Sequence, residues 1–223
     1  MLSKKLASKS RKAIVLLSGG LDSAVTLYSA KAQGFNCYCL IFDYAQRHIK
    51  EIEAAKKIAR YSASDYRVLK ISFPWKGSSL LDKTRKIRGH RGRVIPDTYV
   101  PGRNIIFLSF ALSFAESISA DAIFIGAHAQ DYSGYPDCRP DFFNAFKKVV
   151  CSGTRVGLSG RPIQIKTPLI NKSKADIIKL GIRLKAPLGL SWSCYNGGRR
   201  PCGVCDSCFY RRKGFKEAGI KEL

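Results

Sequence analysis

The segment from Ser18 to Ser23, Ser-Gly-Gly-Leu-Asp-Ser, has the residue types that bind a polyphosphate. Its two glycines let the main chain approach an anion closely, and its two serines offer hydroxyl hydrogen bonds. The carboxylate of Asp22 is a candidate ligand for Mg²⁺ beside the phosphates. The segment lies between an apolar run of strand length and a helical pattern, where backbone N–H groups and the helix dipole favour an anion. We therefore predict a nucleotide-binding loop.

Two other interpretations of this hexapeptide can be weighed from the sequence. One is a Ser/Gly turn in which Asp22 caps the following helix, which accounts for only part of the segment. The other is a better-known nucleotide loop. The sequence contains no G-x-x-x-x-G-K-[ST] run, and no G-x-G-x-x-G follows the first apolar run, so a Walker A enzyme and a Rossmann dehydrogenase are both excluded.

A second group consists of four cysteines close together near the C-terminus, namely Cys194, Cys202, Cys205 and Cys208. The C-x7-C-x2-C-x2-C spacing in a segment with Gly and Pro predicts a closed tetrahedral zinc site. An iron–sulfur cluster and free packed thiols are the alternatives. With four protein ligands the metal would stabilise the segment and leave no position for a reacting water. Cys37 and Cys39 alternate within an apolar run, which is typical of packed strand residues.

A third segment, from Asp131 to Arg139, follows a predicted buried strand. It offers aromatic faces, hydroxyls and carboxylates, above all in Tyr132, Tyr135 and Asp137. In an open parallel sheet, ligands lie beyond the carboxyl ends of the strands. The composition favours a site for a flat heteroaromatic molecule, and an ordinary Gly/Pro/Asp loop is the alternative.

The pattern of apolar residues predicts the strands and helices that position these residues. The alternation of strands and helices predicts an α/β fold with a doubly wound, mainly parallel sheet. A long basic loop is expected at residues 72–103, and a boundary near Pro187 divides a nucleotide-binding domain, 1–186, from a small zinc-binding helical module, 187–223. Strands are expected at 13–17, 36–42, 66–71, 122–126 and near 163, and helices at 22–33, 51–61, 104–119, 141–150 and 172–180.

The composition narrows the class of protein. With 223 residues, 45% of them hydrophobic, the chain can bury one sizeable core, which excludes a disordered protein. The formal net charge of +23 favours anionic partners without choosing among nucleotides, nucleic acid and membrane. The longest apolar stretch, 105–115, is too short to span about 30 Å of hydrocarbon. The basic N-terminus lacks a secretory apolar region, so a cytoplasmic location is expected.

The hexapeptide resembles the SGGxDS loop of the PP-loop ATP pyrophosphatases, enzymes that adenylate a substrate oxygen and release pyrophosphate. Five segments, which occur in the same order as in one family of these enzymes, make the resemblance more specific. Together they look like the 7-cyano-7-deazaguanine synthases, and the likeness extends from about residue 13 to 219. Ala45 stands where that family usually has glycine. The five segments are 18–23, 43–48 (Asp-Tyr-Ala-Gln-Arg-His), 100–104 (Val-Pro-Gly-Arg-Asn), 131–139 and the cysteine-containing run 192–208.

The resemblance implies an adenine nucleotide α hydrolase-like fold and a ligase. Its reaction would convert 7-carboxy-7-deazaguanine and ammonia to 7-cyano-7-deazaguanine through adenylated intermediates, with ATP, Mg²⁺ and Zn²⁺ as cofactors. Asp22 and Ser23 are the expected catalytic residues, and Tyr132, Tyr135, Asp137 and Lys174 the expected substrate-binding residues. The zinc ligands would be the four clustered cysteines. The expected ATP-binding residues are Leu17, Ser18, Gly19, Gly20, Leu21, Asp22, Ser23, Ala24, Val25, Thr26, Leu27 and Arg103.

Several alternatives stay open at this point. A PP-loop enzyme that modifies tRNA directly would use the positive charge to hold the phosphate backbone. A zinc-ribbon module that binds nucleic acid without catalysis, and a relative that activates a different acid or a protein terminus, are the others. The synthase hypothesis requires a small-molecule substrate but no membrane and no stable nucleic-acid complex. It leaves open a homodimer, the source of ammonia, the pathway served, and AMP or ADP as the product.

Overall fold

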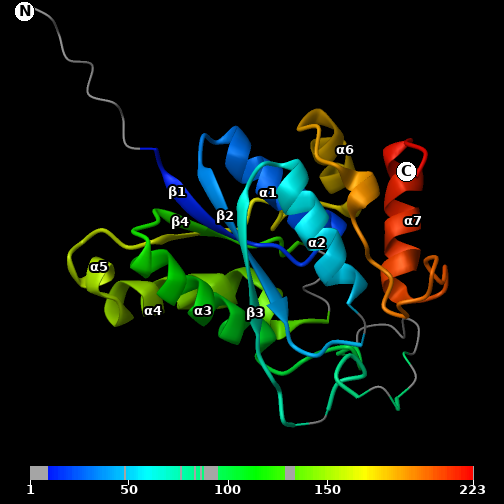
Figure 1. Ribbon diagram of the computed structural model, residues 1–223, viewed down its shortest axis with the longest axis horizontal. Helices are drawn as coiled ribbons and strands as arrows, with labels where there is room; N and C mark the ends of the chain where they lie inside the picture. Colours follow the sequence, from blue (N-terminus) through cyan, green and yellow to red (C-terminus); the bar gives the residue numbers. More distant parts are fainter. Residues whose placement is uncertain are drawn as a thin grey trace, which may run out of the picture.

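The computed structural model describes residues 10–47, 49–75, 77–82, 84–85, 87, 95–128 and 134–222 (Figure 1). The predicted alternation of strands and helices is confirmed, with most element ends within a few residues of the expected ones. The strands are β1 (Lys12–Leu16), β2 (Asn36–Asp43), β3 (Asp65–Lys70), β4 (Ala122–Phe124) and β5 (Gln164–Lys166). The helices are α1 (Leu21–Ala32), α2 (Lys50–Tyr61), α3 (Arg103–Ser117), α4 (Pro140–Gly153), α5 (Arg155–Leu158), α6 (Lys174–Arg183) and α7 (Asp206–Ala218).

The five strands form one parallel sheet in the order β3-β2-β1-β4-β5. The chain runs outward from β1 through β2 to β3, and then returns to the other side of β1 with β4 and β5. In register, Ile14 of β1 lies opposite Tyr38 of β2 and Ile123 of β4. This reversal of direction leaves a crevice beyond the carboxyl ends of β1 and β4, where open α/β sheets bind ligands.

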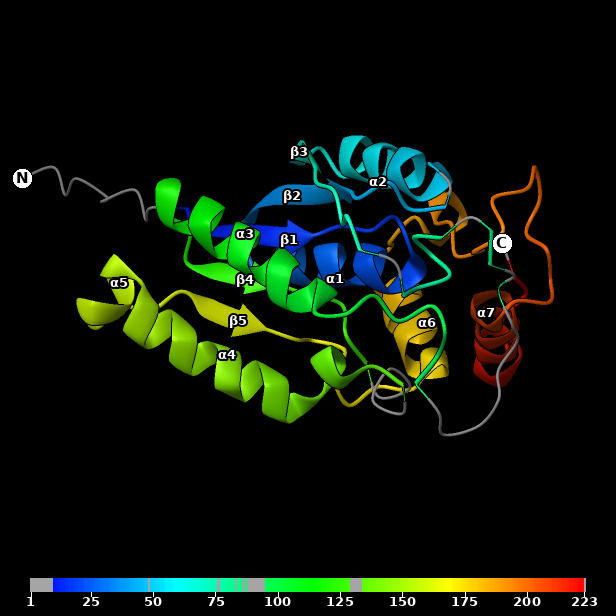
Figure 2. The ribbon, with the colours of Figure 1, turned by 90° about the horizontal axis from the view of Figure 1, so that it is seen from below.

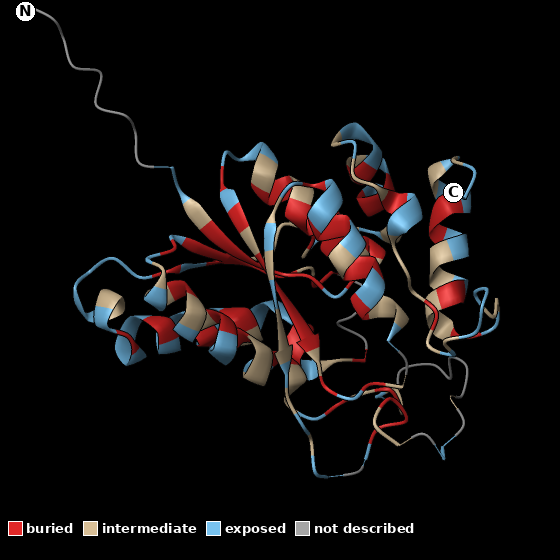
Figure 3. Ribbon diagram, viewed as in Figure 1, coloured by how far each residue is buried: buried red, intermediate tan, exposed pale blue. Residues whose placement is uncertain are grey.

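Helices cover both faces of the sheet, which explains why β1 and β4 are almost wholly apolar. One apolar cluster packs α1 and α2 against one face, with Leu27 and Ile58 fully buried. The other packs α3 and α4 against the opposite face, with Leu108 and Phe143 at its centre. Figure 2 shows the sheet between these layers, and Figure 3 shows that burial is concentrated on the strands and the inner helix faces.

The last two helices lie beyond the carboxyl ends of the strands. Helices α6 and α7 share an apolar cluster with α1 that includes Val25, Ile178, Leu188 and Phe215. Gly214 permits the close approach of α7, because a Cβ there would lie 2.3 Å from a side-chain carbon of Lys174. The helical character expected of the C-terminal segment is present in α7, and the expected boundary at residues 186/187 stays a prediction.

The part of the chain that the structure describes contains no helix with the combination of length and apolar character that crossing a membrane demands.

Candidate active site

The phosphate-binding loop that the sequence predicts connects β1 to α1. Gly19 adopts a φ of +88°, and a Cβ at this position would lie 2.1 Å from the backbone oxygen of Glu51 in α2. Only glycine fits there. Ser18 Oγ accepts a hydrogen bond from Gly20 N at 3.3 Å, and Ser23 Oγ donates one to Gly20 O at 2.9 Å. Gly20 occupies the N-cap position of α1, so the interpretation of Asp22 as the helix cap is wrong.

Asp22 is held by two basic side chains from other elements. Lys174 Nζ, on α6, lies 2.8 and 2.7 Å from the two carboxylate oxygens. His128 Nε2, beyond the end of β4, lies 3.4 Å from Asp22 Oδ2 and 3.1 Å from Lys174 Nζ. Burial opposes ionisation of Asp22, but Lys174 and His128 outweigh it and hold the pKa of this carboxyl below its usual value. The carboxylate is therefore charged, as a Mg²⁺ ligand must be.

A cavity of about 320 Å³ opens beside this loop at the crevice between β1 and β4. Its walls come from the phosphate loop, the segments that follow β2 and β4, the starts of α2, α3 and α6, the turn before α4, and residues 192–211. In that order, the lining residues include Leu17, Ser18, Gly20, Leu21, Asp22 and Ser23; Tyr44, Gln46, Gly126 and His128; Glu51, Arg103, Asn104 and Lys174; Tyr135 and Cys138; and Trp192, Ser193, Tyr195, Asp206, Tyr210 and Arg211. The volume lies within the range of small-molecule sites.

The cavity lining also includes a cluster of three polar side chains that come from the end of β2, from α2 and from the start of α3. Burial opposes the charge of Arg103, but Tyr44, Cys138 and other neighbours raise its pKa above the ordinary value. Burial also raises the pKa of the Tyr44 hydroxyl, against the influence of Arg103. Glu51 is the third member: burial, opposed by Arg103, raises its pKa to about 7. The cluster combines a fixed cation with a carboxyl group that titrates near neutrality.

The residues expected to bind the substrate are only partly brought together. Tyr135 lines the cavity, and its hydroxyl lies 2.8 Å from Thr98 Oγ1. Asp137 is absent from the described residues that line the cavity; its Oδ2 accepts a hydrogen bond from Asn104 N at 2.9 Å. Lys174 lies on the phosphate-loop side, against Asp22. Tyr132 lies outside the described residues.

The expected ATP-binding residues also divide into two groups. The loop residues from Leu17 to Ser23 and Arg103 line the cavity, except that Gly19 faces α2. Ala24 and Leu27 are instead buried against the sheet, and Val25 against α6. Thr26 Oγ1 is buried with no hydrogen-bond partner among the described residues, and a Cβ at Gly126 would lie 2.9 Å from it. The absence of a side chain at Gly126 therefore lets the segment after β4 pack closely against α1 at Asp22 and Thr26.

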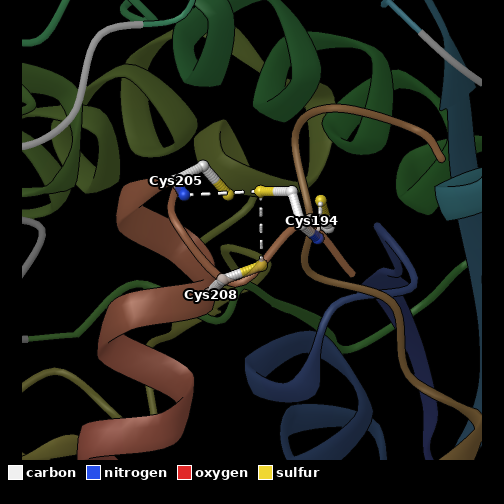
Figure 4. Close-up of side chains that lie close together, drawn as sticks. Cys194, Cys205 and Cys208 are labelled. Carbon is white, nitrogen blue, oxygen red and sulfur yellow. Dashed lines mark hydrogen bonds between the residues drawn. The ribbon is translucent and has the colours of Figure 1, made fainter. Parts of the chain in front are cut away.

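The four clustered cysteines converge as a metal site requires. Their sulfurs all lie within 4.8 Å of one another, and Figure 4 shows the labelled side chains of Cys194, Cys205 and Cys208 turned toward a common centre. Tetrahedral zinc with Zn–S bonds of about 2.3 Å places sulfurs about 3.8 Å apart, so the donor set fits zinc. Burial opposes the Cys202 thiolate, but N–H groups from Val204 and Cys205 lower the pKa of Cys202 to about 6.

The cysteine cluster is tied to the phosphate loop through Trp192. Its backbone N–H donates to Gly19 O at 2.9 Å, and its indole Nε1 donates to Cys194 O at 2.9 Å. Lys50 Nζ lies 4.4 Å from the centre of the indole ring. In α7, Arg211 donates to Ser191 Oγ and Ser193 Oγ at 2.8 and 3.4 Å. The segment from Trp192 to Arg211 therefore forms one wall of the cavity.

The cavity lining includes residues that the sequence does not predict as site residues, among them Glu51, Trp192, Tyr210 and Arg211. Glu51 follows the 43–48 segment closely, and this proximity was the available signal. The other three lie within or beside the cysteine run, whose spacing points to a metal and not to a cavity wall. His128 is not among the site residues that the sequence predicts, and its position beside Asp22 and Lys174 comes only from the fold.

Comparison with known proteins gives a consistent result. A family model described as "Queuosine biosynthesis protein QueC" matches residues 12–219. The chain is 54% identical over 212 residues to the 7-cyano-7-deazaguanine synthase of Acetivibrio thermocellus, covering 94% of this chain and 95% of that protein. It is 46% identical over 216 residues to the 7-cyano-7-deazaguanine synthase of Thermoplasma volcanium, covering 95% and 89%. The alternatives of a direct tRNA enzyme and a zinc-ribbon module are not supported by these matches.

A solved structure supports the fold. The NMN synthetase of Francisella tularensis aligns with 97% of this chain and 80% of its own, with a TM-score of 0.51 and 15% sequence identity. At this level of identity the likeness concerns the fold alone.

Proposed function

The chain belongs to the QueC family of queuosine biosynthesis proteins, and we propose that it converts 7-carboxy-7-deazaguanine and ammonia to 7-cyano-7-deazaguanine at the expense of ATP. Relatives that are 46–54% identical over most of the chain carry the name of this synthase. The observation that carries the proposal for this site is the shared cavity. It brings the phosphate loop at Asp22 together with Arg103 and Tyr135 around one space, whose volume lies in the range of small-molecule sites.

The reaction needs two activations, because neither a carboxylate nor an amide loses its oxygen readily. A carboxylate oxygen attacks the α-phosphorus of ATP and pyrophosphate leaves. Ammonia then attacks the acyl carbon, and AMP and a proton leave to give the amide. The amide oxygen is adenylated by a second ATP, and loss of AMP and two protons gives the nitrile. AMP as the product is part of the proposal and follows from the PP-loop class.

The phosphate loop would bind ATP through Gly20 N–H and the hydroxyls of Ser18 and Ser23. Mg²⁺, when bound at Asp22, would supply neutralisation of phosphate charge. Lys174 would exchange part of its contact with Asp22 for a phosphate oxygen, because both are anionic partners within its reach. These groups position and stabilise charge, and no covalent intermediate with the protein is required.

The side of the cavity at Arg103 and Tyr135 would bind the deazaguanine. Arg103 would pair with the substrate carboxylate, and Tyr135 would offer its ring to the flat heterocycle. Tyr132 and Asp137 stay candidates for substrate binding: the first lies outside the described residues, and the second accepts a hydrogen bond from Asn104.

Zn²⁺ would be held by the four clustered cysteines, where it would stabilise the fold of that segment. A cytoplasmic location is part of the proposal, because its reducing conditions would keep the clustered thiols available for zinc.

The decisive experiment is mass spectrometry of the products formed from 7-carboxy-7-deazaguanine, ammonium and MgATP. We expect the 7-cyano product with wild-type protein and at least a 100-fold loss with Asp22→Ala, because removing a charged group that organises phosphates costs several kcal/mol. Asp65→Ala, an exposed change on β3, is the matched control and keeps full activity. Unchanged acid, with ATP still bound, would contradict the proposal.

A further inference from the structure

The proposed reaction releases protons at nitrogen that some group must accept. Attack by ammonia on the acyl-adenylate leaves one excess proton on nitrogen, and the adenylated amide must lose two before the nitrile is complete. The carboxylate of Asp22 is poorly placed to take them, because Lys174 and His128 surround it and favour its charged form. A second carboxyl group faces the same cavity.

That group is Glu51, in the first turn of α2. The backbone of this turn presses on the phosphate loop, since a Cβ at Gly19 would lie 2.1 Å from Glu51 O and 2.8 Å from Ala55 N. The side chain therefore starts from a point fixed against the loop, and it lines the cavity together with Ser18, Tyr44 and Trp192. Glu53, two residues further along the same turn, is exposed to solvent.

The charged surroundings of Glu51 suit a group that gains and loses a proton at neutral pH. Burial, opposed by Arg103, raises its pKa to about 7, and the Tyr44 hydroxyl is a further electrostatic neighbour. The ideal proton acceptor has a pKa near the working pH. Other titratable or charged groups line the same cavity: Asp22, His128 and Lys174 on the phosphate-loop side, Tyr135 beyond β4, and Tyr195, Asp206, Tyr210 and Arg211 in the C-terminal module.

Building on the proposed function, we propose that Glu51 is the proton acceptor for the reacting nitrogen in both halves of the reaction. In the first half it takes the proton released when ammonia displaces AMP. In the second half, one proton of the adenylated amide goes to water. The other goes to Glu51 while the bond from carbon to the AMP oxygen breaks and the carbon–nitrogen triple bond forms. Glu51 returns its proton to solvent between steps.

The test separates adenylation, which needs no proton acceptor, from the steps that do. In Glu51→Gln, which keeps the shape of the side chain, acid-dependent exchange of pyrophosphate into ATP should stay within about twofold of wild type. Nitrile formation from 7-amido-7-deazaguanine and MgATP in a single turnover should fall at least about 100-fold, the usual contribution of general-base catalysis. Glu51→Asp should recover part of this rate. Glu53→Gln is the matched control and should resemble wild type in both assays.

The pH profile gives a second readout. The amide is the substrate of choice, because ionisation of ammonia then plays no part. The acceptor works only when ionised, so the wild-type rate should rise with pH through about 7, the pKa raised by burial of Glu51. This rise should be absent from the residual rate of Glu51→Gln.

Three results would overturn the inference. If the Glu51→Gln variant forms the nitrile at the wild-type rate, Glu51 is not the proton acceptor. Glu51→Gln that loses exchange in parallel with nitrile formation, or needs more Mg²⁺ for exchange, makes Glu51 a binding or metal-holding residue. Wild-type protein without acid-dependent exchange contradicts the proposed function itself, and the inference falls with it; this outcome is distinguishable because it does not depend on the variant.

Discussion

At the scale of single residues, Ala45 shows how the chain positions the part of the cavity wall that follows β2. It adopts a φ of 58° between two cavity residues, Tyr44 and Gln46. Tyr44 N donates to Gln46 Oε1 at 2.9 Å, and Ala45 N donates to Asp43 Oδ1 at 3.3 Å, so the turn is fixed by its own side chains. A left-handed conformation costs a residue with a Cβ about 1–2 kcal/mol. The glycine usual in the family at this position has a conformational reason.

Replacing Ala45 by glycine should therefore stabilise the protein. We expect Ala45→Gly to raise the free energy of unfolding by about 0.5–1 kcal/mol, because relief of the left-handed strain exceeds the entropy that glycine adds to the unfolded chain. Urea unfolding monitored by circular dichroism measures it. The same exchange at Ala32, an exposed residue in the last turn of α1, should cost about 0.5–1 kcal/mol. An equal decrease in the free energy of unfolding for Ala45→Gly and Ala32→Gly would contradict this explanation.

The site residues that the sequence predicts and those that it misses differ in how they are encoded. The hexapeptide and the cysteines carry their geometry in local spacing, since neighbours in the chain are neighbours in the site. Glu51 and His128 depend on helices and strands brought together from elsewhere. A glutamate in the first turn of an amphipathic helix is ordinarily a solvated charge, and nothing local indicates that Gly19 would admit α2 so closely.

At the scale of elements, the beginning of α3 depends on a residue from another segment. Gly102 at its N-cap has a φ of 65° and supplies no side-chain cap. Asp137 provides one from the short turn before α4: its Oδ2 accepts Asn104 N, and its backbone oxygen accepts Asn104 Nδ2 at 3.0 Å. This contact joins the start of α3, and with it Arg103, to the loop that carries Tyr135.

Removal of this remote cap should affect stability more than substrate binding. Asp137→Ala should lower the free energy of unfolding by about 1–2 kcal/mol, because Asn104 N–H then loses its buried acceptor. Chemical denaturation measures the loss. Asp141→Ala, at an exposed first-turn position of α4, is the control and should cost about 0.5 kcal/mol or less. A raised KM for the acid without a change in stability would instead assign Asp137 to the substrate.

The elements themselves were largely predictable, because the buried strands and the amphipathic helices carry opposite periodicities. The differences lie where local signals are weak. The expected strand 122–126 ends at Phe124, and residues 125–128 leave the sheet to reach the cavity. The single turn α5 was not predicted; Thr154 Oγ1 caps it by accepting Gly157 N at 2.9 Å. Several basic residues of the long loop at 72–103, including Lys83, Lys86 and Arg88, lie outside the described residues.

At the scale of the whole molecule, the cysteine cluster connects to the phosphate loop through a short path. Trp192 donates one hydrogen bond to Cys194 O and another to Gly19 O, and α7 begins next to Cys205 and packs on α6. A metal bound by the cysteines would hold these segments in their observed arrangement, because its bonds to the four sulfurs would join positions 194 to 208 at one point.

Removal of the metal should thus weaken nucleotide binding at a distance. Purified protein is expected to contain about one zinc per chain. A strong chelator should increase hydrogen exchange in residues 192–210 and weaken MgATP binding at least about fivefold, the worth of one lost hydrogen bond to the loop. Metal analysis, hydrogen-exchange mass spectrometry and calorimetry measure the three effects. Cys208→Ser should behave like the chelated protein, and Cys151→Ser, a change at an exposed isolated cysteine, like wild type. An unchanged affinity after metal loss would contradict the connection.

The distance along the chain between the walls of the cavity has a consequence for biosynthesis. Asp22 and Lys174, which touch in the site, are separated by 152 positions, and Trp192 and Arg211 are more distant still from the phosphate loop. The sheet strands β1 to β3 can form while the ribosome is still translating, but the nucleotide site closes only after α7 has left the exit tunnel. We therefore expect that a chain still being translated does not consume ATP, and that termination before α7 leaves a phosphate loop without an enclosed site.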